Sequence, residues 1–316
     1  MPSTPRTPFA PAMPSVSRQS LAPLKHAGRR GTPSRAARRA CAILTAATMA
    51  ATLAGCGPEA AGDPIPVEGP RLSVGIDVGQ PGMAVRSDDG GYVGFDVSVA
   101  TYVAGRLGYA PKQIVWKDVS GTDRVQALDD GAVDLVVASW GDDAHARAGA
   151  DFSDPYLRVR RDLMVRADDT AVTGPASLEG MRLCAPAGAT FAQDIKDRLA
   201  PGVELVDEVG HAQCVTDLLA GTVDAIAHDD VILAGFASTL DGQVRLVGEP
   251  WGEDAYAVGV RGNSPRLVSN VNDALARMVA DGSWQAYADA LAGSIGYAPD
   301  DAINPPGQGD GASAAQ

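Results

Sequence analysis

The first 55 residues contain no aspartate or glutamate, although the chain of 316 residues carries 39 acidic side chains. The same stretch holds eight of the 26 lysines and arginines. A basic N-terminal segment of this kind is typical of a targeting signal, so residues 1–55 are excluded from the fold. The remaining chain has 18 basic against 39 acidic residues, a formal net charge of −21. This excess of negative charge would repel phosphate groups and disfavours nucleic acid as a partner.

The sequence also lacks an apolar run long enough to span a membrane. The run Ala40–Leu53 has 14 residues, whereas a membrane-spanning helix needs about 20. Arginines precede it, and the Leu-Ala-Gly-Cys stretch that ends at Cys56 resembles the cleavage site of a bacterial lipoprotein signal. We therefore predict a signal peptide over residues 1–55 and a lipid on the Cys56 thiol. A chance Leu-Ala-Gly-Cys before an ordinary cleavage site is the alternative.

Cysteine is scarce, with four in the chain. Cys41 lies in the predicted signal and Cys56 at its end, which leaves Cys184 and Cys214 in the folded part. Two cysteines in an exported domain most often pair. The loop that they would close has about 30 residues, which corresponds to about 3–4 kcal/mol of stabilisation in the chain-entropy model. Two separate buried thiols are the alternative, and a metal site is disfavoured because no histidine or second cysteine pair lies nearby.

After a Gly/Pro/Ala-rich tether at residues 56–70, strand and helix patterns alternate along the chain. Strands are expected at Leu72–Ile76, Ile114–Trp116, Val133–Ser139, Arg182–Ala187, Glu204–Val209 and Val223–Ala227. Helices are expected at Val97–Leu107, Arg124–Leu128, Phe191–Leu199, Cys214–Ala220, Ser264–Met278 and Trp284–Leu291. The alternation occurs twice, which predicts two α/β units with largely parallel sheets. Residues 301–316 are rich in Pro, Gly, Ala and Ser and are predicted to be a disordered tail.

Four stretches in order along the chain resemble the periplasmic solute-binding proteins that capture polar amino acids for ABC importers. They are Val74-Gly75-Ile76-Asp77, Gly94-Phe95-Asp96-Val97, the run from Val133 through Arg147 to Asp151-Phe152-Ser153-Asp154-Pro155-Tyr156, and Val223-Asp224-Ala225-Ile226 with Asp229-Asp230. Gly282-Ser283-Trp284 matches a terminal feature of the family. The resemblance spans roughly residues 71–296 and is greatest to actinobacterial glutamate/glutamine-binding lipoproteins, which also carry a cysteine pair in the second lobe.

The resemblance implies the type 2 fold of this family, an α/β fold of two lobes. Two mixed sheets flanked by helices are joined by two crossover hinge strands, and the ligand lies in the cleft between the lobes. Lobe one would comprise residues 71–163 and 256–300, and lobe two residues 164–255. Closure about the hinge would bury the ligand and give a membrane partner a shape to recognise.

An α-amino acid presents a carboxylate and an ammonium group, and burying either one unpaired would be costly. The site therefore needs a guanidinium for the first and a carboxylate for the second. By the resemblance, Arg147 is expected to bind the carboxylate; a surface arginine paired with Asp142 or Asp143 is the alternative. Asp229 matches the ammonium-binding aspartate. Capping of the following helix is its alternative role, and Asp230 could take either part.

Backbone groups complete the expected ligand contacts. Gly188-Ala189-Thr190 resembles the turn in lobe two whose N–H groups, including that of Ala189, face the ligand carboxylate at a helix N-terminus; Thr190 as a plain N-cap is compatible with this. The resemblance implies that backbone groups of Ala138 and Ser139 hold the ammonium. The resemblance also places Gly141 among the ligand-binding positions, although family members often have a threonine there and glycine has no hydroxyl for that contact.

Two further residues are expected to set specificity. Arg124 resembles an arginine that family members with acidic ligands use on the side-chain carboxylate, which would favour glutamate or aspartate over glutamine or asparagine. A solvent-exposed Arg124 bonded to Asp123 or Asp129 is the alternative. Asp77 matches another pocket position, where its carboxylate would orient an arginine or accept a ligand amide.

The chain departs from the family where aromatic side chains often clamp the ligand. The corresponding places here look like Gln80 and Val119. His145 and His228 lie near the expected cleft, but a lone histidine is more often structural, and neither is assigned a ligand contact.

The function that the resemblance implies is an extracytoplasmic binding protein, monomeric and lipid-anchored to the outer face of the cell membrane, which delivers a polar amino acid to an ABC transporter permease. No cofactor and no metal are expected. A sensor that signals to a membrane partner is the alternative, since both would use the same closure. An enzyme is not expected, because the chain has no GxSxG, HExxH or P-loop motif. A dehydratase on this fold, with Asp77 or Glu253 as its acid, is the remote alternative.

Overall fold

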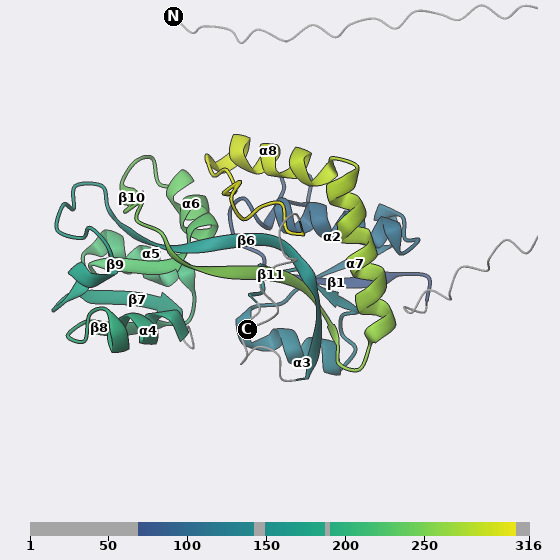
Figure 1. The fold of residues 1–316 in the computed structure, drawn as a ribbon, viewed down its shortest axis with the longest axis horizontal. Coiled ribbons are helices and arrows are strands. Elements are labelled where there is room, and N and C mark those ends of the chain that lie inside the picture. The colour runs from purple at the N-terminus through teal and green to yellow at the C-terminus, as the bar shows by residue number, and fades with distance from the viewer. Residues whose placement is uncertain (1–68, 142–148, 187–189, 308–316) are drawn as a thin grey trace, which may run out of the picture. The chain divides into compact units, whose positions relative to one another are not determined.

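Two strands, β6 (Ala150–Arg166) and β11 (Trp251–Arg261), are much longer than the others and run antiparallel to each other through the middle of the sheet (Figure 1). The structure is a computed structural model and describes residues 69–141, 149–186 and 190–307. The two long strands match the two crossover strands that the family resemblance implies. Their length lets one end of each strand pair with one group of strands and the other end with a second group.

The strands of the described residues form a sheet in the order β4-β1-β5-β11-β6-β9-β7-β8, with β10 beside β6. Parallel pairs join β1 to β4 and β5, and β7 to β8 and β9, whereas the pairs that involve β6 or β11 are antiparallel. The sheet is thus mixed, and the two expected sheets are continuous through the long strands. The short strands are β1 (Leu72–Ile76), β4 (Ile114–Asp118), β5 (Leu135–Val136), β7 (Arg182–Pro186), β8 (Glu204–Glu208), β9 (Ala225–Asp229) and β10 (Val244–Leu246).

A small hairpin stands apart from this sheet. Strands β2 (Val85–Arg86) and β3 (Tyr92–Val93) pair antiparallel around the Asp-Asp-Gly-Gly turn at residues 88–91, as expected for that turn sequence. Gly90 in the turn has a φ of +84°, a conformation that glycine adopts without steric cost.

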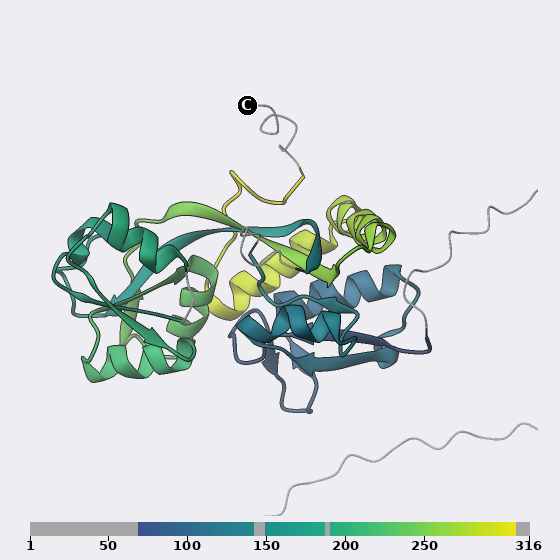
Figure 2. The same ribbon diagram turned by 90° about the horizontal axis from the view of Figure 1, so that it is seen from below.

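Helices cover both groups of strands (Figures 1 and 2). They are α2 (Phe95–Arg106), α3 (Arg124–Asp129), α4 (Thr190–Arg198), α5 (His211–Ala220), α6 (Asp230–Ser238), α7 (Pro265–Ala280) and α8 (Ser283–Ile295), with short 3-10 turns η1 (Pro111–Gln113), η2 (Gly121–Asp123) and η3 (Pro175–Leu178). Helix α7 illustrates why hydrophobic periodicity predicts a helix. Proline occupies its first turn, and the apolar residues at helical spacing, Leu267, Val271, Ala274, Leu275 and Met278, are buried. None of the described helices combines the length and apolar character needed to cross a membrane.

The buried apolar side chains divide into several separate cores. The larger core joins β1, α2, α7 and α8 and includes Tyr156 and Tyr256 of the long strands. In the other lobe, one core packs β7 and β9 against α4, and another packs them against α5 and α6. Cys184 of β7 and Cys214 of α5 form the expected disulfide, with their Cα atoms 5.6 Å apart. The fold is therefore the two-lobed α/β architecture that the sequence predicts.

The prediction of a disordered tail from residue 301 is wrong for residues 301–307. Asn304 is 6% exposed. Its side-chain oxygen accepts a bond from the Arg158 N–H at 3.0 Å, and its side-chain nitrogen donates to the Arg158 carbonyl at 2.8 Å. One amide thus satisfies both backbone groups of a residue in β6, which composition alone does not reveal. Residues 308–316 lie outside the described residues.

Candidate functional site

Asp77 and Arg124 form a partly buried ion pair in the lobe that contains β1. Asp77 follows the last residue of β1, and Arg124 begins α3; their side chains are 16% and 11% exposed and 3.0 Å apart. The Gln80 side-chain nitrogen donates to the same carboxylate at 3.2 Å, and the Arg124 guanidinium lies 5.7 Å from the centre of the Trp140 ring. Asp77 thus takes the first of its two predicted roles, orienting an arginine, and Arg124 is not the solvent-exposed residue of the alternative.

Ser139 is held in an uncommon backbone conformation, with a φ of +47°. Its hydroxyl donates to Asp96 at 2.8 Å, and its N–H donates to the Tyr156 hydroxyl at 3.2 Å, which itself donates to Asp96 at 2.7 Å. Burial raises the pKa of Asp96 to about 6, against these hydrogen bonds. A strained residue fixed by such a network is typical of a functional site. The same hydrogen bonds hold the backbone at Ser139, directly after Ala138, in this conformation.

The glycine at position 141 has a steric reason. Gly141 bridges to Tyr256 of β11, and a Cβ atom on it would lie only 2.6 Å from both carboxylate oxygens of Asp254. At this distance one of the two side chains must shift. The threonine that family members often carry at this place would therefore displace the Asp254 carboxylate.

Asp229 is the buried carboxylate of the other lobe. It ends β9, is 5% exposed, and accepts a hydrogen bond from the Tyr256 hydroxyl at 2.5 Å. Burial raises its pKa, and its side chain makes no capping bond to α6, so the capping alternative is wrong. The neighbouring Asp230 accepts bonds from the Val231 N–H at 2.8 Å and the Tyr297 hydroxyl at 3.0 Å. Both bonds, and a third from the Arg160 N–H at 3.3 Å, are accepted by the same oxygen, Oδ1.

Two histidines pack against each other beside Asp229. The rings of His211, which begins α5, and His228 of β9 lie 4.4 Å apart, and Phe191 of α4 packs edge-on against His228 at 5.5 Å. Burial, together with a smaller effect of the positive charge of Arg124, lowers the pKa of His211 to about 2 and that of His228 to about 3. Both rings are neutral at physiological pH, and Arg124, from the other lobe, lies close enough for its charge to act on them.

A second arginine, Arg161 of β6, lies next to this group. Its Cα is paired with that of Asp229 across the β6–β9 ladder. Its guanidinium lies 3.5 Å from the Asp254 carboxylate and 5.5 Å from the centre of the Phe191 ring. The side chain is 20% exposed. Arg161 therefore joins the long strands to the end of β9.

Four buried side-chain atoms of the described residues have no hydrogen-bond partner, and all belong to residues at this place. They are Gln80 Oε1, Arg124 Nε, Arg161 Nε and His211 Nε2. Leaving such an atom unsatisfied costs about 1–3 kcal/mol, and more for a charged group. Native proteins rarely accept this without a reason. Unsatisfied donors and acceptors from both lobes are what a polar ligand would bind, and they define the candidate site.

Several predicted site residues cannot be placed. Arg147, Ala189 and Cys56 lie outside the described residues, and Thr190 begins α4 but its side chain is not described. Within the described ranges, no three His, Cys, Asp or Glu side chains are grouped so as to hold a metal ion.

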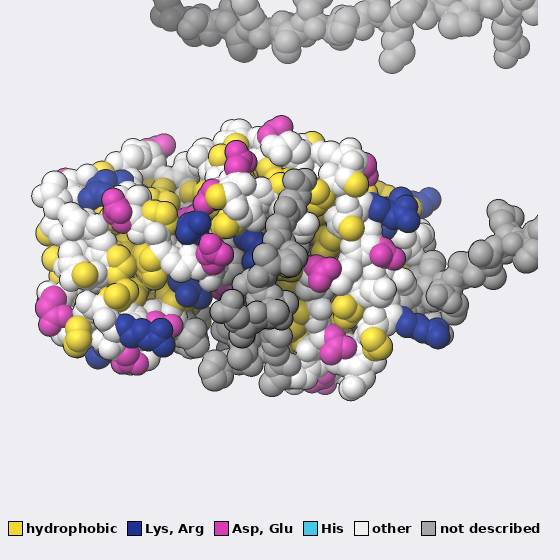
Figure 3. Space-filling view, viewed as in Figure 1, with side chains coloured by type: hydrophobic (Ala, Val, Ile, Leu, Met, Phe, Trp, Pro, Cys, Tyr) yellow, Lys and Arg dark blue, Asp and Glu magenta, His cyan; other side chains and the backbone are white. Residues whose placement is uncertain are grey.

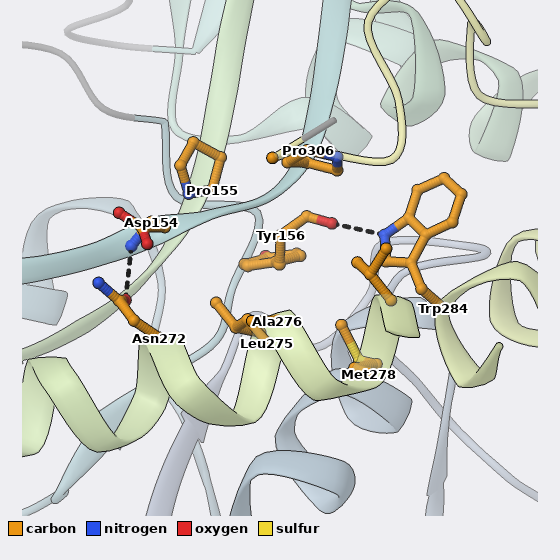
Figure 4. A pocket seen from close by; sticks show the side chains of 11 residues that line it. Asp154, Pro155, Tyr156, Asn272, Leu275, Ala276, Met278, Trp284 and Pro306 are labelled. Atoms are coloured by element: carbon orange, nitrogen blue, oxygen red, sulfur yellow. Dashed lines mark hydrogen bonds between the residues drawn. The ribbon is translucent and has the colours of Figure 1, made fainter. Parts of the chain in front are cut away.

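A separate hollow lies elsewhere among the described residues. A pocket of about 350 Å³ is formed by β6, α7, α8 and the C-terminal segment (Figure 4). Its polar groups are already bonded: the Asp154 N–H donates to Asn272 and the Trp284 ring N–H to the Tyr156 carbonyl, each at 2.8 Å. No ion pair lies among the described residues that line it. The cluster of Arg124, Arg161, His211 and His228 between the lobes is therefore the stronger candidate site.

Comparison with known proteins settles the family. The profile of bacterial extracellular solute-binding proteins, family 3, matches residues 72–293, well over half of the chain. The chain belongs to this family. This agrees with the resemblance found in the sequence.

Two relatives show the range of ligands within the family. The chain is 34% identical over 261 residues to the glutamate-binding protein GluB of Corynebacterium efficiens, covering 77% of this chain and 88% of that protein. It is 27% identical over 191 residues to the ABC transporter glutamine-binding protein GlnH of Bacillus subtilis, covering 60% and 69%. Both are binding proteins by name, not enzymes.

A solved structure supports the fold. An ancestral arginine-binding protein bound to glutamine superposes with a TM-score of 0.65 at 24% identity, covering 73% of this chain and 100% of that one. At this identity the likeness establishes the two-lobed architecture of the chain and does not identify its ligand.

The sequence did not point to Arg161 or His211, and it noted Gln80 only as a missing aromatic. The available signal for Arg161 was only its place in a charged part of the crossover strand, which also holds Arg158, Arg160 and Asp162. His211 stands at the start of its helix with no motif around it, so only the packing of α5 against β9 reveals its place.

Proposed function

We propose that this member of the family captures glutamate or aspartate, and with lower affinity glutamine or asparagine, between its lobes and delivers it to an ABC transporter. The observation that carries the proposal concerns Arg124, which is partly buried and fixed by Asp77. Its Nε atom is buried and has no hydrogen-bond partner among the described residues. A buried guanidinium with a free N–H favours an anionic partner over a neutral amide. The 34% identity to a glutamate-binding protein supports the same ligand class.

The rest of the ligand would be held as the family resemblance implies. Arg147 and the N–H groups of the turn that includes Ala189 and Thr190 would bind the α-carboxylate. Asp229 would pair with the ammonium, helped by backbone groups of Ala138 and Ser139. The described geometry supports the role of Asp229, because its buried carboxylate has one tyrosine bond and free lone pairs toward the cluster.

Delivery would depend on closure of the two lobes. We propose lobe one as residues 71–163 and 256–300 and lobe two as residues 164–255, with the ligand holding the closed form together. A transporter permease would recognise that form of the monomer. The relation to GlnH of an ABC transporter supports import over signalling to a membrane sensor.

The membrane anchor is a separate part of the proposal. Residues 1–55 would be a signal peptide, Cys56 would carry a lipid at the outer face of the membrane, and residues 56–70 would be the tether. Mass spectrometry of the mature N-terminus tests this. A lipid-modified Cys56 is expected, and an unmodified or uncleaved N-terminus would contradict the anchor.

Calorimetric titration of the purified protein with glutamate, aspartate, glutamine, asparagine and arginine tests the ligand. The acidic amino acids are expected to bind most tightly. Arg147→Ala is expected to abolish binding of all of them, whereas Arg124→Ala should weaken the acidic ligands selectively, by about 10- to 100-fold. Unchanged glutamate affinity in Arg124→Ala would show that Arg124 does not bind the side-chain carboxylate of the ligand.

A further inference from the structure

Arg161 has the marks of a ligand-binding residue but no role in the site proposed above. It lies on the crossover strand β6, opposite Asp229 in the ladder, where its charge opposes the rise that burial causes in the pKa of that carboxyl. Its guanidinium packs over the Phe191 ring, and its Nε is buried without a partner. Arg161 therefore lies at the same cluster as Arg124, but it extends from the crossover strand β6, whereas Arg124 extends from α3.

The neighbouring Arg160 shows what a purely structural arginine looks like on this strand. Its guanidinium lies 3.1 Å from Asp300 and 3.5 Å from Glu253, on the other face of the strand. Side chains alternate between faces along a strand. Arg160 is thus held between two carboxylates near the surface, with its side chain 30% exposed, and Arg161 points toward the cluster.

The pair with Asp254 does not satisfy Arg161. A guanidinium has five N–H donors, and the contact with Asp254, at 3.5 Å, lies at the long limit of a hydrogen bond. The adjacent His228 is neutral and Asp229 is bonded to Tyr256. A mostly buried cation in this position keeps the capacity to bind a second anion, and the unpartnered Nε is the donor that would do so.

We propose that Arg161 is a second specificity-determining cation, which acts with Arg124 to select amino acids whose side chain ends in a carboxylate. This inference rests on the proposed function, since it assumes that an amino acid binds at the cluster. The two guanidiniums come from different elements, α3 and β6, and each is held at one end by a carboxylate, Asp77 or Asp254, while its Nε stays free. The paired carboxylates orient the arginines, and the free N–H groups recognise the ligand.

The test compares Arg161→Gln with the matched variant Arg160→Gln, one residue along the same strand. Glutamate and glutamine are each titrated by calorimetry into the wild type and both variants. Arg161→Gln is expected to lose about 10- to 100-fold in glutamate affinity, the range of a hydrogen bond to a charged group, and less than about 3-fold in glutamine affinity. Arg160→Gln is expected to leave both affinities within about 2-fold, in keeping with an exposed ion pair.

The outcomes separate the inference from the function on which it rests. An equal loss for both ligands would mean that Arg161 only supports the fold of the hinge, and an unchanged glutamate affinity would mean that it does not face the ligand; either overturns the inference. Failure of the wild type to bind any amino acid would overturn the proposed function instead.

A second variant covers the case in which Arg161→Gln does not fold, which circular dichroism would show. Arg161→Lys keeps a positive charge for Asp254 but removes the Nε–H donor and the planar fork. We expect it to fold and to lose at least about 5-fold of the preference for glutamate over glutamine, a loss within the range of one charged hydrogen bond. A wild-type preference in this variant would overturn the inference.

Discussion

At the scale of single residues, the two adjacent aspartates at the end of β9 have different environments. Asp229 is buried with one tyrosine bond, whereas Asp230 is bonded to the Val231 N–H and the Tyr297 hydroxyl. Asp229 is the more buried of the two, and its carboxylate lies 3.6 Å from the His228 ring nitrogen. The sequence left open which of the two binds the ammonium, and this environment favours Asp229.

Asp229→Asn is expected to weaken ligand binding by at least about 100-fold, because the ligand ammonium would be buried without an anionic partner. Asp230→Asn is the matched control and should keep the affinity within a few-fold, while lowering stability through its bond to Tyr297. Titration calorimetry of both variants checks this. The reverse order of effects would assign the ammonium to Asp230.

The histidine pair predicts a dependence of stability on pH. The pKa of His211 is lowered from 6.5 to about 2 in the folded protein. Above pH 6.5 the imidazole is neutral in both states, so it contributes no difference. As the pH falls below that value, the unfolded chain takes up a proton that the folded protein does not, and stability is lost until the folded pKa is reached.

His211→Gln should therefore reduce the acid sensitivity of the ligand-free protein. One pH unit below the unfolded pKa, the penalty on the wild type is about 1.4 kcal/mol. Denaturant unfolding gives the free energy of unfolding of the wild type and of the variant at about pH 7 and about pH 5.5. The penalty appears as a change in the difference between the two proteins from one pH to the other. A difference that does not change with pH would show that His211 is protonated in the folded state.

Among single residues, a position at the end of an element could be predicted from the sequence, whereas a contact that depends on packing could not. Asp77, Arg124 and Asp229 stand at the ends of predicted strands or helices, so their pairing and burial follow once the strands are aligned. Arg161 contacts Asp254, 93 residues away. A contact between two such distant residues leaves no local pattern in the sequence.

At the scale of elements, regular periodicity decided what was predictable. Helix α7 and strand β1 have one environment along their whole length, so a single pattern describes each. Strands β6 and β11 pass from one lobe to the other, and β11 has register shifts along its pairing with β6. Buried and exposed positions therefore do not alternate along them, and their length came only from the family resemblance.

The disulfide ties β7 to α5, the helix that carries His211. Replacing both Cys184 and Cys214 with alanine is expected to lower the free energy of unfolding by about 3–4 kcal/mol, from the entropy of the loop that they close. Urea denaturation under non-reducing conditions measures the loss. Wild type under reducing conditions is the control and should approach the variant; a loss below about 1 kcal/mol would contradict the assignment.

At the scale of the whole molecule, Figure 3 shows acidic and basic side chains interspersed over one face. The net charge of the chain is therefore not gathered into one patch on that face. This arrangement favours solubility.

A close contact joins the two groups of elements. Gly235 of α6 lies so near Pro81, in the loop after β1, that a Cβ on it would overlap the Pro81 carbonyl oxygen. Helix α6 follows Asp229, and the loop follows Asp77. The contact therefore closes the molecule beside the site, and a side chain there would hold the two groups apart.

Gly235→Ala is expected to weaken ligand affinity by about 10-fold or more, since overpacking costs about 1–3 kcal/mol. Gly105→Ala is the control, because Gly105 also lies in a helix but a Cβ on it would meet no neighbouring element within 4 Å among the described residues. It should leave affinity unchanged and raise stability by about 0.5–1 kcal/mol. Wild-type affinity in Gly235→Ala would show that this contact does not limit closure.

The central claim is that the cluster between the lobes binds an amino acid with an acidic side chain. Its most direct test is calorimetric titration of the purified protein with glutamate, glutamine and arginine under one set of conditions. The free guanidinium donors of Arg124 and Arg161 predict that glutamate binds more tightly than glutamine. Arginine, whose side chain is itself a cation, is expected to bind more weakly than either. Binding of none of the three, or a preference for arginine, would contradict the account.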